Sequence, residues 1–321
     1  MHNTIRETVA VDFEAVNAFI VEQLHSNVEL VENIGHYIIG AGGKRMRPML
    51  VLLAARACQG ASDNAVKLAA VIEFIHTATL LHDDVVDMSS MRRGRPTANE
   101  QWNNPSSVLV GDFLYSRAFQ VLVSINHMGI MKVIADTTNT IAEGEVLQLL
   151  NKHRTDITEQ DYMRVIRDKT AVLFEAAAYC GALIAGADEV VSQNLKAAGL
   201  HLGLAFQLVD DALDYDGKAE DLGKNVGDDL AEGKPTLPLL YAMQNSDSKD
   251  SDLLHQAVIT GGAEQLDEVI RIISQSGALE YTRKRAHEHA DLARQHLTTL
   301  PASEYQQALL QMCDLAVARV S

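Results

Sequence analysis

The stretch VIEFIHTATLLHDDVVD (residues 71–87) decides the fold, because it is a long apolar segment that ends in three aspartates. A second stretch, GLAFQLVDDALDY (residues 203–215), ends in the same Asp-Asp-x-x-Asp pattern. An apolar run longer than an ordinary strand favours a helix that is buried on most of its sides. Two buried helices that each end in three acids are the most specific feature of the chain.

Outward from these two segments, apolar residues recur every three or four positions, which is the period of an amphipathic helix. No segment keeps the alternation of a half-buried strand. We therefore predict an all-α fold, with one domain over residues 1–321. The expected helices cover about residues 12–39, 49–57, 64–88, 108–150, 159–185 and 192–215, followed by a long loop at 216–238 and further helices to the C-terminus.

The composition excludes several classes of protein. Of 321 residues, 27 are Lys or Arg and 43 are Asp or Glu, and the net charge of −16 disfavours a nucleic-acid partner or an anionic membrane. Three widely spaced cysteines indicate neither a disulfide framework nor a zinc site. The sequence shows no signal peptide and no apolar run near the roughly 18 residues of a membrane span. We expect a cytoplasmic protein without stable membrane insertion.

The two aspartate triplets predict a metal site. Residues three and four positions apart share a helix face, so the three carboxylates of each triplet lie close together. At an effective dielectric constant near 20, each like-charge pair costs on the order of 3 kcal/mol. Mg²⁺ compensates such charge and commonly binds one or two carboxylates together with substrate phosphates. A solvated acidic face is the simpler alternative, but it does not explain why two buried helices end in this way. The triplets are Asp83, Asp84, Asp87 and Asp210, Asp211, Asp214.

Basic residues beside the triplets indicate that the metal serves a diphosphate. Arginine holds phosphate oxygens in a bidentate fork, and two basic clusters occur in glycine-containing loops of this acidic chain. The clusters are Lys44, Arg45 and Arg47, and Arg92, Arg93 and Arg95. His76 shares a helix face with the first triplet, and Gln207 shares one with the second. Taken alone, each basic cluster would be an ordinary charged loop, and His76 would be an ordinary core residue.

At these motifs the chain resembles the all-trans polyprenyl diphosphate synthases, and within them the bacterial octaprenyl diphosphate synthases. The resemblance is dense from about residue 10 to 240 and loose in the C-terminal helices. It rests on GGKRMRP (42–48), EFIHTATLLHDDVVD (73–87), MRRGRPT (91–97), VLVGDFLYSRAF (108–119), AEGEVLQL (142–149), KTAVLFEAA (169–177), AFQLVDDALDY (205–215), GKNVGDDL (223–230) and EGKPTLP (232–238).

The resemblance implies a helical bundle around a deep cavity, with the two triplets facing each other across its mouth, and a homodimer. It implies that isopentenyl diphosphate is bound by Lys44, Arg47, His76 and Arg93. The allylic diphosphate would be bound by Arg92, Lys169, Thr170, Gln207, Lys224 and Lys234, with Mg²⁺ held by Asp83, Asp87, Asp210 and Asp214. All six triplet aspartates, Arg92 and Lys169 would carry the catalysis.

The expected reaction is repeated condensation of isopentenyl diphosphate onto an allylic diphosphate, with farnesyl diphosphate as the expected primer. The expected product is octaprenyl diphosphate, which would supply the side chain of a quinone. Ala78 is small and Thr79 is not aromatic, so the product can grow past this turn of the helix. Val121 and Leu122 are expected to line part of the cavity floor. Ala78 and Thr79 therefore predict a long product.

Several alternatives remain open. A geranylgeranyl-type synthase would make a shorter product with the same motifs. A di-iron carboxylate bundle would use Glu22-x-x-His25 and Glu73-x-x-His76, but it leaves both triplets and the basic loops unexplained. A terpene cyclase needs no loop for a second diphosphate. A non-catalytic partner subunit would be expected to have lost acids from a triplet, and both triplets are intact.

Overall fold

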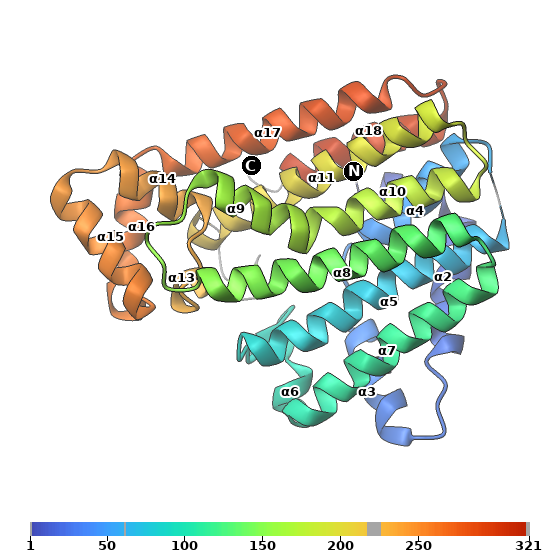
Figure 1. The fold of residues 1–321 in the computed structure, drawn as a ribbon, viewed down its shortest axis with the longest axis horizontal. Coiled ribbons are helices and arrows are strands. Elements are labelled where there is room, and N and C mark those ends of the chain that lie inside the picture. The colour runs from blue at the N-terminus through green and yellow to red at the C-terminus, as the bar shows by residue number, and fades with distance from the viewer. Residues whose placement is uncertain (1, 61, 217–225, 319–321) are drawn as a thin grey trace. The chain divides into compact units, whose positions relative to one another are not determined.

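A computed structural model describes residues 2–60, 62–216 and 226–318, and the prediction of an all-α fold is confirmed (Figure 1). Its α-helices are α1 (His2–Thr8), α2 (Ala10–Gln23), α3 (Glu29–Gly40), α4 (Met46–Ala57), α5 (Asp63–Val86), α6 (Ala98–Gln101), α7 (Asn104–Ile125), α8 (Met128–Asn151), α9 (Glu159–Ile166), α10 (Val172–Ile184), α11 (Glu189–Asp216), α13 (Asp228–Ala231), α14 (Leu237–Asn245), α15 (Ser248–Thr260), α16 (Leu266–Gln275), α17 (Ala278–Leu297) and α18 (Glu304–Val317). A π-helix, η1 (Arg167–Ala171), joins α9 to α10, and a 3₁₀ turn, η2 (Ala263–Gln265), precedes α16.

The structure corrects four details of the predicted elements. The helix expected over 12–39 is interrupted between α2 and α3, and the helix expected over 108–150 ends at Asn126, which has the left-handed φ of 55° typical of a helix end. The long loop contains α13 and the start of α14. The loop after the first triplet is a short antiparallel hairpin of β1 (Met91–Arg92) and β2 (Arg95–Pro96). Strands of two residues are too short to show an alternating pattern in the sequence.

The chain forms two compact units, and the prediction of a single domain stays a prediction. Unit 1 comprises residues 1–138, 173–199 and 294–312, and unit 2 comprises residues 139–172, 200–293 and 313–321. The first triplet belongs to unit 1 and the second triplet to unit 2. Each unit therefore positions its own set of acids.

Helix α5 is the central element of unit 1. It packs along α7 and also contacts α2 and α4. The Ser62 hydroxyl caps its start by accepting a hydrogen bond from the Ala65 amide. Phe74 and Ile75 have no solvent exposure, and almost every residue between 68 and 78 is buried. This burial fixes the rotation of α5 and so determines which of its aspartates point into the protein.

By length and composition alone, α5 and α7 could each cross a membrane, which the sequence analysis did not expect. In the most apolar window of α5, 67% of the residues are buried inside the protein, whereas in α7 the share is 39%. The apolar length of α5 is thus that of a core helix that must bury all of its sides. These are the two such helices within the part of the chain that the structure describes.

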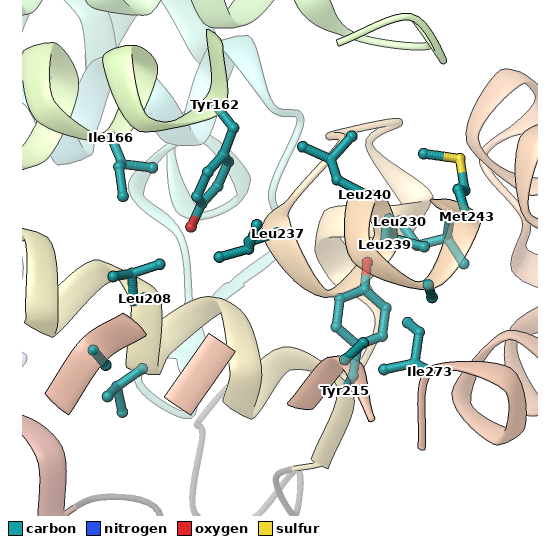
Figure 2. Close-up of a cluster of buried hydrophobic side chains, with 14 of the residues drawn as sticks. Tyr162, Ile166, Leu208, Tyr215, Leu230, Leu237, Leu239, Leu240, Met243 and Ile273 are labelled. Carbon is teal, nitrogen blue, oxygen red and sulfur yellow. The ribbon is translucent and has the colours of Figure 1, made fainter. Parts of the chain in front are cut away.

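Unit 2 is built on a cluster of buried side chains from α9, α11, α14, α15 and α16 (Figure 2). Two tyrosines, Tyr162 and Tyr215, are buried within it, at 4% and 2% exposure. Figure 2 shows Tyr162 with its hydroxyl turned toward the helix that carries Leu208, which is α11. A buried tyrosine hydroxyl needs a hydrogen-bond partner, and α11 supplies one.

Candidate active site

The first triplet lies at the C-terminal end of α5, where Asp87 is the last residue of the turn and its amide donates to the Asp83 carbonyl at 2.8 Å. Asp84 turns inward and its side chain has no solvent exposure. Arg92 donates from Nε and Nη2 to Oδ1 of Asp84, at 2.8 and 2.6 Å. Oδ2 of Asp84 is buried without a hydrogen-bond partner among the described residues. Burial, with Asp83 and Asp87 adding to it, raises the pKa of Asp84 despite the arginine.

The hairpin places Arg93 against the glycines of the first basic loop. Arg93 and Gly94 form its two-residue turn with φ values of 53° and 73°, as a tight hairpin requires. The Arg93 guanidinium donates to the Gly42 carbonyl. A Cβ on Gly43, which itself has φ of 124°, would lie 2.6 Å from this guanidinium. Gly43 is therefore needed both for its backbone conformation and for the approach of Arg93.

Arg45 and Arg47 have different roles although they are neighbours in the sequence. Arg45 has a left-handed φ of 48° and donates to Glu73 at 2.7 Å, so it neutralises a carboxylate with 5% exposure. Arg47 lies 4.4 Å above the Phe174 ring and donates to Nε2 of His76 at 3.2 Å. Burial first, and then the nearby arginines, lower the pKa of His76 well below its usual value. His76 is therefore neutral and accepts from Arg47.

In unit 2, hydrogen bonds converge on the middle aspartate of the second triplet. Tyr162 donates to Oδ2 of Asp211 at 2.6 Å, and the Gln207 amide donates to Oδ1 at 2.7 Å. The Thr170 hydroxyl in turn donates to Oε1 of Gln207 at 3.0 Å. Burial first, and then the charge of Asp229, raise the pKa of Asp211 to about 7, although both donors act in the opposite direction. Asp211 is the buried anchor of this group.

Asp214 and Lys234 connect the second triplet to the segment that follows it. Asp214 has no solvent exposure, and its Oδ2 accepts from the Asp229 amide at 3.1 Å. The Lys234 ammonium forms an ion pair with Glu232. Lys224, which the sequence analysis assigned to the allylic diphosphate, lies outside the described residues.

The π-helix η1 presents Lys169 and Thr170 to a cavity of about 110 Å³ within unit 2. Single π turns of this kind occur frequently at functional sites. The Lys169 ammonium is held by Glu145 and Gln148 of α8, at 2.6 and 2.8 Å. The cavity brings together five residues predicted from the sequence: Lys169, Thr170, Gln207, Asp211 and Lys234.

Gly144 of α8 allows η1 to approach this closely. A Cβ at Gly144 would lie 2.8 Å from the Lys169 amide nitrogen, and backbone cannot yield as a flexible side chain can. We expect Gly144→Ala to lower the free energy of unfolding by about 1–3 kcal/mol through overpacking, although alanine is the better helix former. Urea unfolding would measure this. Gly129→Ala in the same helix meets only the His127 side chain and should leave stability unchanged; an equal loss in both variants would contradict the explanation.

The structure adds residues that the sequence analysis did not assign to the site. Tyr162, Gln148 and Asp229 line the cavity, and Glu145 holds Lys169. Glu145 and Gln148 fall within AEGEVLQL and Asp229 within GKNVGDDL, so the motifs contained a signal for them. Tyr162 lies outside every quoted motif and is found only from the fold.

Residues predicted to set product length lie on two helices of unit 1 that pack together. Ala78 of α5 is fully buried, and the Thr79 hydroxyl donates to the His76 carbonyl at 2.8 Å. On α7, Val121 and Leu122 are 5% and 1% exposed. Their roles stay predictions, as do those of the exposed Lys44 and of the triplet residues Asp83, Asp87 and Asp210.

The donors present fit Mg²⁺. Within residues 2–60, 62–216 and 226–318, no three His, Cys, Asp or Glu side chains converge into a ready metal cage. Mg²⁺ does not need one, because one or two carboxylates with substrate phosphates commonly complete its coordination. Oδ2 of Asp84 is buried with no hydrogen-bond partner in the part of the chain that the structure describes, and a divalent cation at the triplet would stabilise the charged form of this carboxylate.

Comparison with known proteins confirms the resemblance. A profile described as polyprenyl synthetase matches residues 28–275. The chain is 51% identical to octaprenyl diphosphate synthase of Escherichia coli (strain K12), over 98% of both chains. It is also 51% identical to the all-trans-nonaprenyl-diphosphate synthase (geranyl-diphosphate specific) of Rhodobacter capsulatus, over 97% of this chain and 96% of that protein.

The solved structures agree with these relatives. The chain superposes with a TM-score of 0.97 on the polyprenyl synthase from Caulobacter crescentus CB15, solved with calcium and isoprenyl diphosphate. The two are 43% identical, and the match covers 100% of this chain and 98% of that one. Sequence, motifs and fold thus lead to one assignment: the chain belongs to the polyprenyl synthetase family.

Proposed function

We propose that the protein is a long-chain trans-prenyltransferase that condenses isopentenyl diphosphate repeatedly onto farnesyl diphosphate to give octaprenyl diphosphate for a quinone side chain. The 51% identity to octaprenyl diphosphate synthase, over 98% of both chains, supports this product. The observation that carries the proposal is that both aspartate triplets are complete and that the middle acid of each is buried and hydrogen-bonded. Such support would hold the outer acids of each triplet at a fixed orientation.

The chemistry begins with cleavage of the allylic C–O bond, which leaves diphosphate and an allylic cation. The double bond of isopentenyl diphosphate attacks this cation to form a C–C bond, and a proton is lost to the departed diphosphate. When bound at Asp83, Asp87, Asp210 and Asp214, Mg²⁺ would neutralise charge that develops on the leaving diphosphate.

The basic side chains hold the two diphosphates in this proposal. Lys169, kept in place by Glu145 and Gln148, would bind the allylic diphosphate together with Arg92, Thr170, Gln207, Lys224 and Lys234. Arg47, His76, Arg93 and Lys44 would bind isopentenyl diphosphate. Neutral His76 adds no charge but orients Arg47, which Phe174 supports from below.

Elongation of farnesyl diphosphate by purified protein tests the proposed function. The protein would be incubated with labelled isopentenyl diphosphate, farnesyl diphosphate and Mg²⁺, and the product sized by mass spectrometry. A C40 diphosphate is expected. A C20 product would favour the shorter-chain alternative, and absence of any elongation, or bound iron in place of Mg²⁺ dependence, would contradict the proposal.

Ala78 provides a test of product length. Ala78→Phe adds a ring at a fully buried position five residues before Asp83, so the growing chain should stop earlier. We expect shorter products by mass spectrometry with initial condensation retained. Ala55→Phe adds the same ring at a buried position on α4 and controls for general overpacking. Unchanged product length in Ala78→Phe would remove this residue from length control.

We also propose that the enzyme is cytoplasmic and works as a homodimer. The apolar side chains Leu109 and Val123 on α7 are 66% and 64% exposed in a single chain, and a second copy that covers α7 would remove them from water. Light scattering after size-exclusion chromatography would test this, with a mass near 35.1 kDa contradicting it.

A further inference from the structure

Four side chains of unit 2 form a continuous series of hydrogen bonds, which we call the relay: Tyr162, Asp211, Gln207 and Thr170. The three donor–acceptor distances are 2.6, 2.7 and 3.0 Å. The members come from three elements, since Tyr162 lies on α9, Thr170 on η1, and Asp211 with Gln207 on α11. All four line the same cavity.

Asp211 sets the direction of the whole relay. Its two oxygens both accept, one from the Tyr162 hydroxyl and the other from the Gln207 amide nitrogen. The Gln207 amide must therefore turn its NH₂ group toward Asp211 and its oxygen toward Thr170. Thr170 then has to donate to that oxygen, as observed. Each group in the relay thus has one orientation.

Tyr162 completes the relay at its buried end. The side chain is 4% exposed, and its hydroxyl occupies the Asp211 oxygen that Gln207 does not reach. Without this donor, a buried carboxylate oxygen would lose its hydrogen bond, and the carboxylate would turn to recover one. Gln207 is hydrogen-bonded to the same carboxylate and Thr170 is hydrogen-bonded to Gln207, so the orientation of both would no longer be fixed.

We infer that Tyr162 is a positioning residue for the allylic diphosphate, acting through Asp211 on Gln207 and Thr170. This inference rests on the proposed function, in which Gln207 and Thr170 contact that diphosphate. It assigns Asp211 a role different from its neighbours in the triplet, because both of its oxygens are used within the protein. In this inference Tyr162 acts through Asp211, because its hydroxyl is used by that carboxylate.

The test is Tyr162→Phe, which keeps the ring in the apolar cluster and removes only the hydroxyl. We expect the KM for farnesyl diphosphate to rise about tenfold, because a hydrogen bond to a charged group is lost, and the KM for isopentenyl diphosphate to stay within twofold. Tyr281→Phe is the matched control. It removes a tyrosine–carboxylate bond of 2.7 Å to Glu159, on the same helix α9 but outside the relay.

A second variant, Asp211→Asn, keeps the inference testable if Tyr162→Phe fails to fold. Asp211→Asn keeps the volume of the side chain but cannot accept from both donors, so it should give the same selective rise in KM. In addition, Thr170→Val combined with Tyr162→Phe should lose less than the sum of the single losses, because both act through Gln207.

Two results would overturn the inference. One is an allylic KM in Tyr162→Phe equal to that in Tyr281→Phe, and the other is an equal rise in both KM values, which indicates a merely structural role. Calorimetric binding of farnesyl diphosphate repeats the comparison without turnover. A failed elongation assay would therefore count against the proposed function, while the binding comparison would still decide the role of Tyr162.

Discussion

Replacing Asp83 or Asp210 with alanine should lower kcat for the condensation by at least about 10³-fold, which corresponds to about 4 kcal/mol. Each change removes a proposed Mg²⁺ ligand and with it charge stabilisation of the leaving diphosphate. Labelled isopentenyl diphosphate with farnesyl diphosphate measures the rate. The Mg²⁺ concentration for half-maximal activity should rise in both variants, because fewer carboxylates remain to bind the ion.

Asp136→Ala is the control for these variants. Asp136 lies on α8, is 66% exposed and forms an ion pair with Lys132 one turn away, so its loss should leave the rate within twofold. Exposed pairs of this kind contribute little to stability. If either triplet variant turned over within tenfold of the natural enzyme, the triplet would not hold the catalytic metal.

Arg92→Met should be the most destabilising change near the first triplet, with a loss of about 3 kcal/mol in the free energy of unfolding. Arg92 donates twice to Asp84, whose side chain has no solvent exposure. Removing one partner leaves a buried carboxylate without compensation, which is far more costly than the net contribution of the pair. Urea unfolding monitored by circular dichroism measures the effect.

Two further variants separate stability from substrate binding. Arg95 lies in the same hairpin and is exposed. Arg95→Met should therefore change the free energy of unfolding by less than about 0.5 kcal/mol. Adding Asp84→Leu to Arg92→Met replaces the whole pair by apolar side chains and should recover most of the stability. Elongation should stay impaired, because Arg92 is also proposed to bind the allylic diphosphate. Full recovery of activity would show that Arg92 serves the fold alone.

The two triplets behave differently from what equal spacing implies. The spacing predicts three equivalent carboxylates on one helix face. In the structure Asp84 is held by Arg92, whereas Asp211 is held by Tyr162 and Gln207. The supporting groups differ in chemistry and in distance along the chain, since Arg92 lies 8 positions from Asp84 and Tyr162 lies 49 positions from Asp211. No local pattern contains that information.

Arg45 and Arg47 of the first basic loop also differ in their contacts, although they are only two positions apart in the sequence. Charge alone predicts that Arg45 and Arg47 both bind phosphate. The left-handed backbone at Arg45 directs its side chain to buried Glu73, while Arg47 packs on Phe174 and reaches His76. A single φ angle thus separates a structural arginine from a candidate ligand.

The sequence by itself determined the helical class, the apolar helices α5 and α11, and the two acid triplets at their ends, because these depend on periodicity and spacing within a few turns. The tertiary structure alone decided which acids are buried, that Tyr162 belongs to the site, and that η1 with Gly144 presents Lys169. Hydrogen bonds form only near 3 Å, and which side chains come that close depends on how distant helices pack.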